Sequence, residues 1–383
     1  MIDINKKEDC CGCHGCKSIC PKGCIRMKND EEGFWYPKID KSICIDCNLC
    51  EKVCPMDKNK IGEKKDIIAY ACKNKDNEIR INSSSGGVFS LLCEMVISNG
   101  GVVFGAAYNE KLEVCHSYSE SIDGCIKFRG SKYVQSRIGD MYIKVKEFLQ
   151  AGRIVLFSGT PCQVSGLECY LMKKYRNLIL VDIACHGVPS PLVFKKYINQ
   201  IENDRRNKVT DIQFRDKSTG WKSYSLNISL KEERIFEKGY DNVYMKGFLG
   251  DLYLRPSCYE CEFKKPITSA DITLADYWGV QHIHDEFDDD KGVSLILANT
   301  DVGKEVLKTL KDKLEIINTN LEFALKYNPS IINHAKYNKK RKVFFSEINS
   351  ERNNLIKSIN KYTKDSLKYR VKIYLRKIKK KLT

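Results

Sequence analysis

The chain has 383 residues, 19 of them cysteine, and a formal net charge of +16 at pH 7. Its hydrophobic content of 42% is typical of a globular protein, and its length predicts two or three domains. No apolar run approaches the ~18 residues that a membrane-spanning helix needs, which excludes an integral helical membrane protein.

The positive charge is concentrated at one end of the chain. Residues 336–383 have a net charge of +14, which leaves only +2 for residues 1–335. A nearly neutral body without a DNA- or RNA-binding motif argues against a nucleic-acid-binding protein. The first residues contain no signal-like apolar segment, so we expect a cytoplasmic protein. Thiols stay reduced in that compartment, and metal binding is therefore the expected use of the cysteines.

The first predicted domain begins with "CCGCHGCKSICP", residues 10–21. The spacing C-x2-C-x2-C-x3-C-P occurs there and again at residues 44–55, and it is the pattern of bacterial ferredoxins. In that pattern, three cysteines of one repeat and the fourth cysteine of the other repeat hold each [4Fe-4S] cluster. We predict that cluster one is bound by Cys10, Cys13, Cys16 and Cys54, and cluster two by Cys44, Cys47, Cys50 and Cys20.

The alternative for these repeats is a zinc module, which usually needs only two C-x2-C pairs for each ion. The third cysteine and the following proline favour the ferredoxin interpretation. Between the repeats, "GFWYPKID" (33–40) is interpreted as a short aromatic hairpin, and Cys11 and Cys24 as buried small residues rather than ligands. Residues 1–60 are therefore predicted to be a 2[4Fe-4S] ferredoxin domain, followed by a charged linker at 57–66.

The next segment, 61–335, alternates apolar strands with amphipathic helices, which predicts a mixed α/β domain with a substantially parallel sheet. Residues 211–216 and 224–230 are expected to form a hairpin-like excursion from it. The expected helices are 87–100, 141–152, 162–174, 191–202 and 302–314, and the other expected strands are 101–108, 153–159, 178–185, 270–278 and 293–300.

Four cysteines of this domain lie where chemistry is expected. Cys162 follows a strand and Pro161 at the start of a helix, where the helix dipole favours a thiolate. Cys185 ends a strand at the rim of the sheet, where α/β folds bind ligands. Cys258 and Cys261 form a C-x2-C pair. Together they provide enough ligands for a third cluster or a zinc ion, and unrelated buried cysteines are the alternative.

A glycine-rich turn is the other signal. In "INSSSGGVFS" (81–90), Ser84 and Ser85 are expected to cap the following helix, and its amides could bind a phosphate. An ordinary capped helix is the alternative, because no dinucleotide-binding or Walker motif is present.

Six stretches in this order resemble the family of coenzyme F420 hydrogenase/dehydrogenase beta subunits. They are "SSSGGVFS", "GSKYVQS", "SGTPCQVSGL", "CHGVPSP", "CYECEF" and "ADITLADYWG", within residues 69–300. The resemblance implies FAD beside a [4Fe-4S] cluster, with hydride exchanged with a deazaflavin. It implies that Cys162, Cys185, Cys258 and Cys261 bind that cluster. It also implies that Ser85, Gly86, Gly87, Lys132, Tyr133 and Ser136 bind the flavin.

These features predict an iron-sulfur flavoprotein oxidoreductase that connects a one-electron carrier, such as a ferredoxin or a partner subunit, with a hydride donor or acceptor. The fused ferredoxin is absent from the beta subunit of the hydrogenase, and the Lys-, Asn- and Ile-rich composition differs from that of most deazaflavin-using proteins, so the organic partner stays open. The alternative is a non-enzymatic electron-transfer subunit.

Several other groups have two interpretations. His186 could act on a cluster sulfur or cap a strand, and Asp271 and Asp276 could bind a flavin hydroxyl or cap turns. His282, His284 and Asp288 could bind a divalent metal, although a solvated acidic loop is the simpler explanation. The basic, helical tail at 336–383 places Val371, Leu375, Ile378 and Leu382 on one face, which suits peripheral contact with an anionic membrane or a solvated helix.

Overall fold

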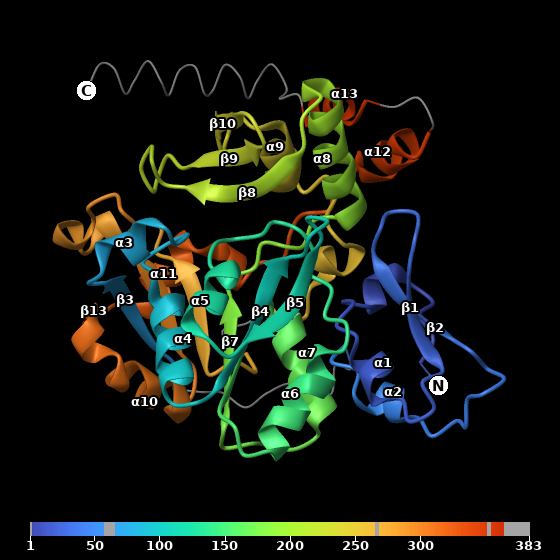
Figure 1. Cartoon of the computed structure of the whole chain (residues 1–383), viewed down its shortest axis with the longest axis horizontal. Helices are drawn as coiled ribbons and strands as arrows, with labels where there is room; N and C mark the ends of the chain where they lie inside the picture. Colours follow the sequence, from blue (N-terminus) through green and yellow to red (C-terminus); the bar gives the residue numbers. More distant parts are fainter. Residues whose placement is uncertain (1, 57–65, 265–267, 351–353, 364–383) are drawn as a thin grey trace.

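The computed structural model describes residues 2–56, 66–264, 268–350 and 354–363 (Figure 1). Almost all of the predicted linker and the four apolar residues of the predicted amphipathic tail lie outside these ranges. Within them, we find no helix with both the length and the apolar character required to cross a bilayer.

The ferredoxin-like region contains two short helices, α1 (Gly15–Ile19) and α2 (Leu49–Lys52), and the antiparallel strands β1 (Ile25–Asn29) and β2 (Trp35–Ile39). Both helices follow a residue in the left-handed conformation, His14 and Asn48 respectively, so the two cysteine repeats have the same local geometry. The aromatic stretch at 33–40 is the turn and second strand of the hairpin. The polar first strand, β1, had no signal strong enough to be predicted.

The central element of the body is an eight-stranded sheet with the order β13-β3-β12-β11-β7-β6-β4-β5. Strands β3, β11, β7, β6 and β4 point the same way, whereas β12, β13 and β5 run antiparallel to their neighbours. The mixed α/β prediction is confirmed. The strands are β3 (Ile68–Asn74), β4 (Val102–Tyr108), β5 (Val114–Ser119), β6 (Val155–Gly159), β7 (Leu178–Ile183), β11 (Ile272–Asp276), β12 (Ser294–Ala298) and β13 (Leu314–Asn318).

Helices cover both faces of this sheet (Figure 1). One apolar cluster joins the sheet to α4 (Val88–Ser98), α5 (Ile122–Cys125) and α10 (Asp301–Thr309). On the opposite face, α6 (Met141–Gln150) and α7 (Pro161–Leu171) pack against β4, β6 and β7. Short helices α3 (Asn77–Ile81) and α11 (Leu321–Tyr327) flank the β3 side.

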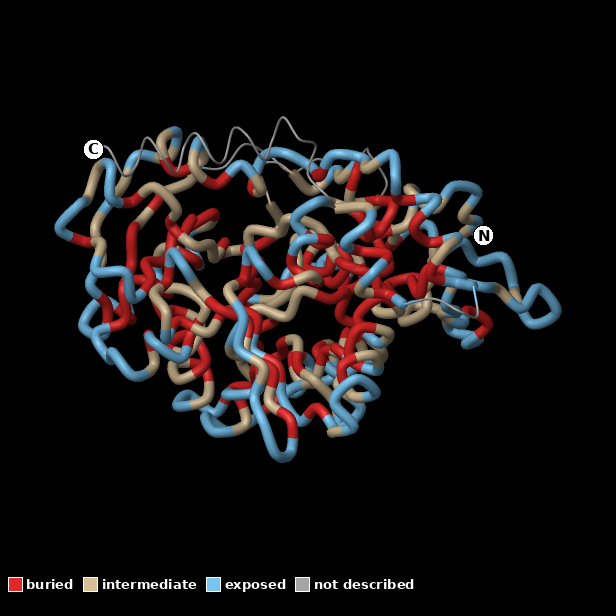
Figure 2. Tube along the Cα trace, turned by 90° about the horizontal axis from the view of Figure 1, so that it is seen from above, coloured by how far each residue is buried: buried red, intermediate tan, exposed pale blue. Residues whose placement is uncertain are grey.

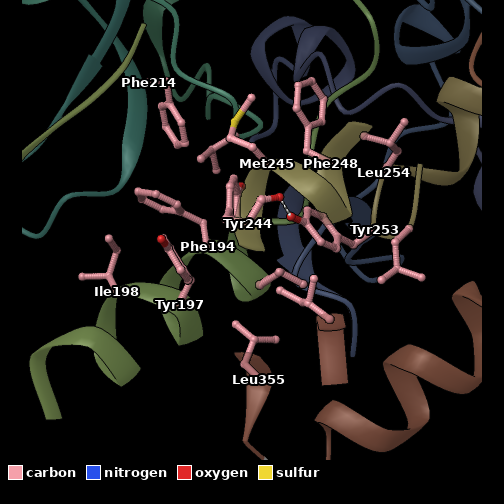
Figure 3. Packing of buried hydrophobic residues seen from close by; sticks show 14 of the residues in the cluster. Phe194, Tyr197, Ile198, Phe214, Tyr244, Met245, Phe248, Tyr253, Leu254 and Leu355 are labelled. Carbon is pink, nitrogen blue, oxygen red and sulfur yellow. Dashed lines mark hydrogen bonds between the residues drawn. The ribbon is translucent and has the colours of Figure 1, made fainter. Parts of the chain in front are cut away.

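The predicted excursion is a separate three-stranded sheet, made of β8 (Val209–Asp216), β9 (Ser225–Leu230) and β10 (Arg234–Lys238). It packs with α8 (Pro191–Arg205) and α9 (Val243–Leu249) around a core rich in aromatic residues (Figure 3). In that core, Tyr244 of α9 lies against Phe194 of α8 and Phe214 of β8, with ring centroids 5.8 and 5.7 Å apart. Phe34 and Tyr36 of the ferredoxin-like hairpin belong to the same cluster.

The segment that we expected to be a separate basic tail contributes to this core. Helices α12 (Arg341–Ile348) and α13 (Leu355–Thr363) place Phe344 and Ile359 at 0% exposure, beside α8 and α9. Burying each such side chain contributes about 1.5–3 kcal/mol. The strongly basic composition of residues 336–383 gave no indication of these buried apolar residues. The described part of the segment packs into the folded body.

Buried segments are concentrated in the interior of the molecule, and exposed segments lie at the rim (Figure 2). Short 3-10 helices connect the main elements: η1 (Lys7–Asp9), η2 (Ile126–Phe128), η3 (Pro256–Glu260), η4 (Val280–His282), η5 (Asp285–Phe287), η6 (Lys311–Lys313) and η7 (Pro329–Ile331).

Candidate functional site

The ferredoxin-like region contains two cysteine-lined cavities. One is lined by the four cysteines predicted for cluster two, Cys20, Cys44, Cys47 and Cys50, together with Cys24. The other is lined by the four predicted for cluster one, Cys10, Cys13, Cys16 and Cys54, together with Cys11. Each cavity combines three cysteines of one repeat with the last cysteine of the other, which is the crossed arrangement expected from the spacing.

A third cavity lies in the body, and it brings together the other four predicted cysteines, Cys162, Cys185, Cys258 and Cys261. Cys11 of the ferredoxin-like region lines this cavity too. All three cavities are thus lined by at least four cysteine side chains.

Local structure explains the position of Cys162. Thr160 caps α7, and its backbone N–H donates to the side chain of Gln163, 3.0 Å away, in a capping box. Pro161 occupies the first turn, so the helix begins at the end of β6 as the sequence predicted. A hydrogen bond from Cys11 lowers the pKa of Cys162 to about 7, whereas burial raises the pKa of Cys261 to about 12.

The donor sets consist of cysteine thiols, which are the ligands of iron-sulfur clusters. In the described part of the chain, no three His, Cys, Asp or Glu side chains converge closely enough to hold one ion. A zinc ion needs thiolate sulfurs at about 2.3 Å from one point. Iron and sulfide atoms occupy the centre of a cluster and hold its thiolates farther apart, so four cysteines around a larger cavity suit that group.

Cys11 and Cys24 are buried, as expected, but they are not distant from the predicted ligands. The Cys24 sulfur lies 3.2 Å from that of Cys20. The Cys11 thiol hydrogen-bonds with the thiols of Cys13 and Cys162, one from each of two predicted ligand sets. Sequence spacing could not reveal this, because Cys162 is distant in the chain.

The structure brings together the two segments predicted to bind flavin. The Ser84 hydroxyl accepts a hydrogen bond from the Ser131 backbone (2.8 Å), next to Lys132. Ser85 donates to the Val293 carbonyl (2.7 Å) and so anchors the turn rather than capping the helix. The N-cap of α4 is Gly87, without a side-chain cap, so the predicted serine caps are wrong. A Cβ at Gly86 would lie 2.4 Å from a backbone oxygen, which explains the need for glycine there.

Lys132, Tyr133 and Ser136 lie along one loop in different environments. Burial lowers the pKa of Lys132 to about 8, and its ammonium donates to the carbonyls of Arg129 (3.0 Å) and Gly130 (3.2 Å). Tyr133 packs against the aromatic core. The Ser136 hydroxyl instead bonds with His116, 2.7 Å away, beneath the loop. Lys132 is therefore the charged member of the three, and its side chain is partly buried.

Sequence reasoning missed the residue that links these segments, Arg215 of β8. It pairs with Asp276 (2.7 Å) and donates to the Tyr133 hydroxyl and the Ser84 carbonyl (both 3.3 Å). Its Nε is buried and has no partner among the described residues. The N–H at this Nε could donate a hydrogen bond to a phosphate or carbonyl oxygen of a ligand. No spacing rule pointed to Arg215, because it lies in the excursion.

The remaining candidates have structural partners. The Asp271 carboxylate accepts from the Leu180 backbone of β7 and from the hydroxyl of Thr300, the N-cap residue of α10, so it connects these two elements. His186 bonds with Asp251 at 2.7 Å.

The three members of the possible divalent-metal group are engaged separately. His282 bonds with Gln281 (3.4 Å), His284 with Thr319 (3.1 Å), and Asp288 pairs with Lys222. These separate partners favour the interpretation as an ordinary loop.

Comparison with known proteins supports the same family. The family model for the C-terminal part of the coenzyme F420 hydrogenase/dehydrogenase beta subunit matches residues 152–322. A subunit of the F420H2 dehydrogenase of Methanosarcina mazei is 22% identical over 330 residues, 83% of this chain and 86% of that protein. A chain of the F420-reducing [NiFe] hydrogenase complex from Methanosarcina barkeri has a TM-score of 0.48 and 16% identity, covering 74% of this chain and 92% of that one.

Shorter matches concern ferredoxins. An uncharacterized ferredoxin from Methanocaldococcus jannaschii is 39% identical over 52 residues, 14% of this chain and 66% of that protein. A 7Fe ferredoxin from Hydrogenibacillus schlegelii is 41% identical over 51 residues, 13% of this chain and 59% of that protein. These matches agree with the resemblance inferred from the motifs: residues 152–322 fit the model of the coenzyme F420 hydrogenase/dehydrogenase beta-subunit family, and a stretch of about 50 residues is similar to ferredoxins.

Proposed function

We propose that this protein is an iron-sulfur flavoprotein oxidoreductase with three [4Fe-4S] clusters and one FAD. It passes electrons between a one-electron carrier and a hydride-exchanging organic partner. The observation that carries the proposal is the set of three cysteine-lined cavities, each with the four cysteines that the motifs predict. A zinc module would not need the crossed pairing of the first two, and unrelated cysteines would not meet in the third.

The residues of the chain hold the third donor set in place. The Val188 backbone N–H donates to the Cys258 sulfur at 3.4 Å, and Lys264 donates to the carbonyl of Cys185. Such hydrogen bonds fix the ligand geometry and stabilise negative charge on the sulfur atoms. The Thr160 hydroxyl lies 3.2 Å from the Cys162 sulfur, within hydrogen-bonding distance.

A bound flavin would supply conversion between one-electron and two-electron chemistry. In the proposed site, Ser85, Gly86 and Gly87 form the turn, and Lys132 and Arg215 supply positive charge toward the phosphates. Tyr133 holds the loop against the body, because its hydroxyl accepts a bond from Arg215. The name of the relative from Methanosarcina mazei suggests reduced coenzyme F420 as the first hydride donor to test, beside NADH.

The test is a combined count of iron, acid-labile sulfide and flavin in protein purified without oxygen. About twelve irons and one FAD for each chain are expected. About eight irons without flavin would leave only the ferredoxin clusters and would replace the enzyme with an electron-transfer subunit. A Cys47→Ser variant that keeps its flavin should lose activity with the physiological carrier, and full activity would contradict electron entry through cluster two.

A further inference from the structure

The cavities of cluster one and the third cluster share a wall. Cys11 lines both cavities, and Met56 does too. Helix α7, which carries Cys162, approaches the cluster-one loop so closely that a Cβ at Gly166 would lie 2.7 Å from the Cys13 Cβ. These two sites are therefore direct neighbours. The cluster-two cavity is built from residues 20–25, 39 and 44–50 and lies outside this junction.

Arg255 occupies this junction, and its side chain is completely buried. It lines the third cavity, three residues before Cys258. Its guanidinium donates to the Cys10 carbonyl (2.8 Å), the Trp35 carbonyl (3.0 Å) and the Gln135 side-chain oxygen (3.0 Å). One arginine thus connects the cluster-one loop, the ferredoxin hairpin and the loop that carries Lys132.

All three acceptors are uncharged, and the guanidinium also lies over the Tyr36 ring, 4.4 Å from its centroid. A buried cation normally has a carboxylate partner, because desolvation of an ion costs several kcal/mol. Here the groups beside the guanidinium belong to the predicted cluster ligands: the Cys10 carbonyl accepts its hydrogen bond, and Cys258 lines the same cavity as Arg255.

The backbone is adapted to this arginine. Gly12, in the cluster-one loop, has a φ of +71°, and a Cβ there would lie 2.8 Å from an Arg255 nitrogen. Glycine therefore permits both the turn and the approach of the guanidinium. The positive charge lies beside predicted cluster one and in the wall of the third-cluster cavity, whereas it does not line the cluster-two cavity.

We propose that Arg255 is a fixed positive charge that raises the reduction potentials of cluster one and the third cluster relative to cluster two. The inference rests on the proposed function, because it requires the three clusters to be present. Each reduction adds one electron, supplied by the external one-electron carrier, and makes the cluster more negative by one charge. A nearby cation in a low-dielectric wall stabilises that reduced state. Electrons entering at cluster two are thereby drawn toward the junction.

The test is a redox titration followed by electron paramagnetic resonance, with dithionite as reductant, on anaerobically purified full-length protein. In Arg255→Met, two of the three midpoint potentials should fall by at least a tenfold change in the reduction equilibrium, about 59 mV for one electron. The midpoint potential of cluster two should not change. Arg255→Lys keeps the charge and should shift the two potentials less than Arg255→Met.

A second variant leaves the arginine in place. Gln135→Glu puts a carboxylate against the guanidinium, so it should lower the same two potentials even if Arg255→Met does not fold. The control is the double variant Glu32→Gln/Arg341→Met, which removes a neutral buried pair from the same domain interface and should leave all three potentials unchanged.

If the potentials were unchanged in Gln135→Glu or Arg255→Met, with iron and sulfide content equal to wild type, the proposed role of Arg255 would be wrong. The proposed function of the protein would not be affected by that result. An equal shift in Arg255→Lys and Arg255→Met would also overturn the role of Arg255, because the effect would then come from packing. A wild-type protein with about eight irons would instead overturn the proposed function.

Discussion

The contact between the two ends of the chain offers the sharpest test of how the ferredoxin domain is held. Glu32, in the turn of the β1–β2 hairpin, makes a bidentate ion pair with Arg341 of α12, at 2.8 and 2.5 Å. Their side chains are only 10% and 7% exposed. Arg341 also donates to the Leu254 carbonyl (3.0 Å), and the Glu32 carbonyl accepts from Ser190. The pair is therefore closely surrounded by protein.

Glu32→Gln would leave the Arg341 charge buried without its carboxylate. Breaking one partner of a buried pair costs about 3–5 kcal/mol. Because each 1.36 kcal/mol is a factor of ten, 3 kcal/mol corresponds to roughly a hundredfold easier local opening. Hydrogen exchange of β1, β2 and α12 amides in the intact protein measures that opening without requiring reversible unfolding. We expect exchange to accelerate about a hundredfold in those elements.

The matched control is Glu305→Gln, which breaks the exposed pair with Lys308 and should change exchange by less than about fivefold, as surface pairs contribute at most about 1 kcal/mol. The double variant Glu32→Gln/Arg341→Met should recover part of the loss, since no charge remains buried. If Glu32→Gln exchanged like the Glu305→Gln control, the pair would not hold the ferredoxin domain and our account of this interface would be refuted.

Three further predictions concern the proposed centres. Cys162→Ser should reduce the iron count from about twelve to about eight while the two ferredoxin clusters remain; an unchanged count would remove Cys162 from the ligand set. Gly166→Ala should lower the free energy of unfolding by about 1–3 kcal/mol, because the added methyl group pushes α7 away from Cys13, and it should alter the electron paramagnetic resonance signal of cluster one. The control is Gly100→Ala, at a left-handed turn glycine with open space around it, which should leave that signal unchanged. Because the pKa of Lys132 is lowered to about 8, its ammonium loses its proton as the pH rises through that value. The affinity of apoprotein for FAD, measured by flavin fluorescence, should therefore fall between pH 7 and pH 9, and Lys132→Met should bind weakly at both values; pH-independent binding by wild type would exclude Lys132 from the site.

Local patterns predicted much of the fold. Helices α4, α6, α7 and α8 and strands β4, β6 and β7 were predicted within a few residues, because each carries its own apolar periodicity. Strands β1, β3, β5, β10 and β13 were missed. β5 and β13 lie at the edges of the sheet, where partial exposure weakens the apolar pattern.

In the candidate sites too, features set by local sequence were predicted and features set by contacts between distant segments were not. Cysteine spacing predicted which thiols share a cavity, because short loops determine the direction of their side chains. Arg255, Gly166 and Cys11 could not be interpreted from spacing, since their roles arise only where the ferredoxin domain meets the body. Arg215 was missed because its partners Asp276, Tyr133 and Ser84 come from distant segments of the body.

The pairing of Glu32 with Arg341 has a consequence for biogenesis. These residues are 309 positions apart. At a synthesis rate of 5–20 residues per second, α12 follows the hairpin by roughly 15 to 60 s. During that interval the nascent ferredoxin domain lacks this ion pair, whereas body residues that contact it, such as Ser190 and Arg255, are made earlier. Cellular machinery that delivers iron and sulfide would have this interval before Arg341 of α12 binds the turn of the hairpin.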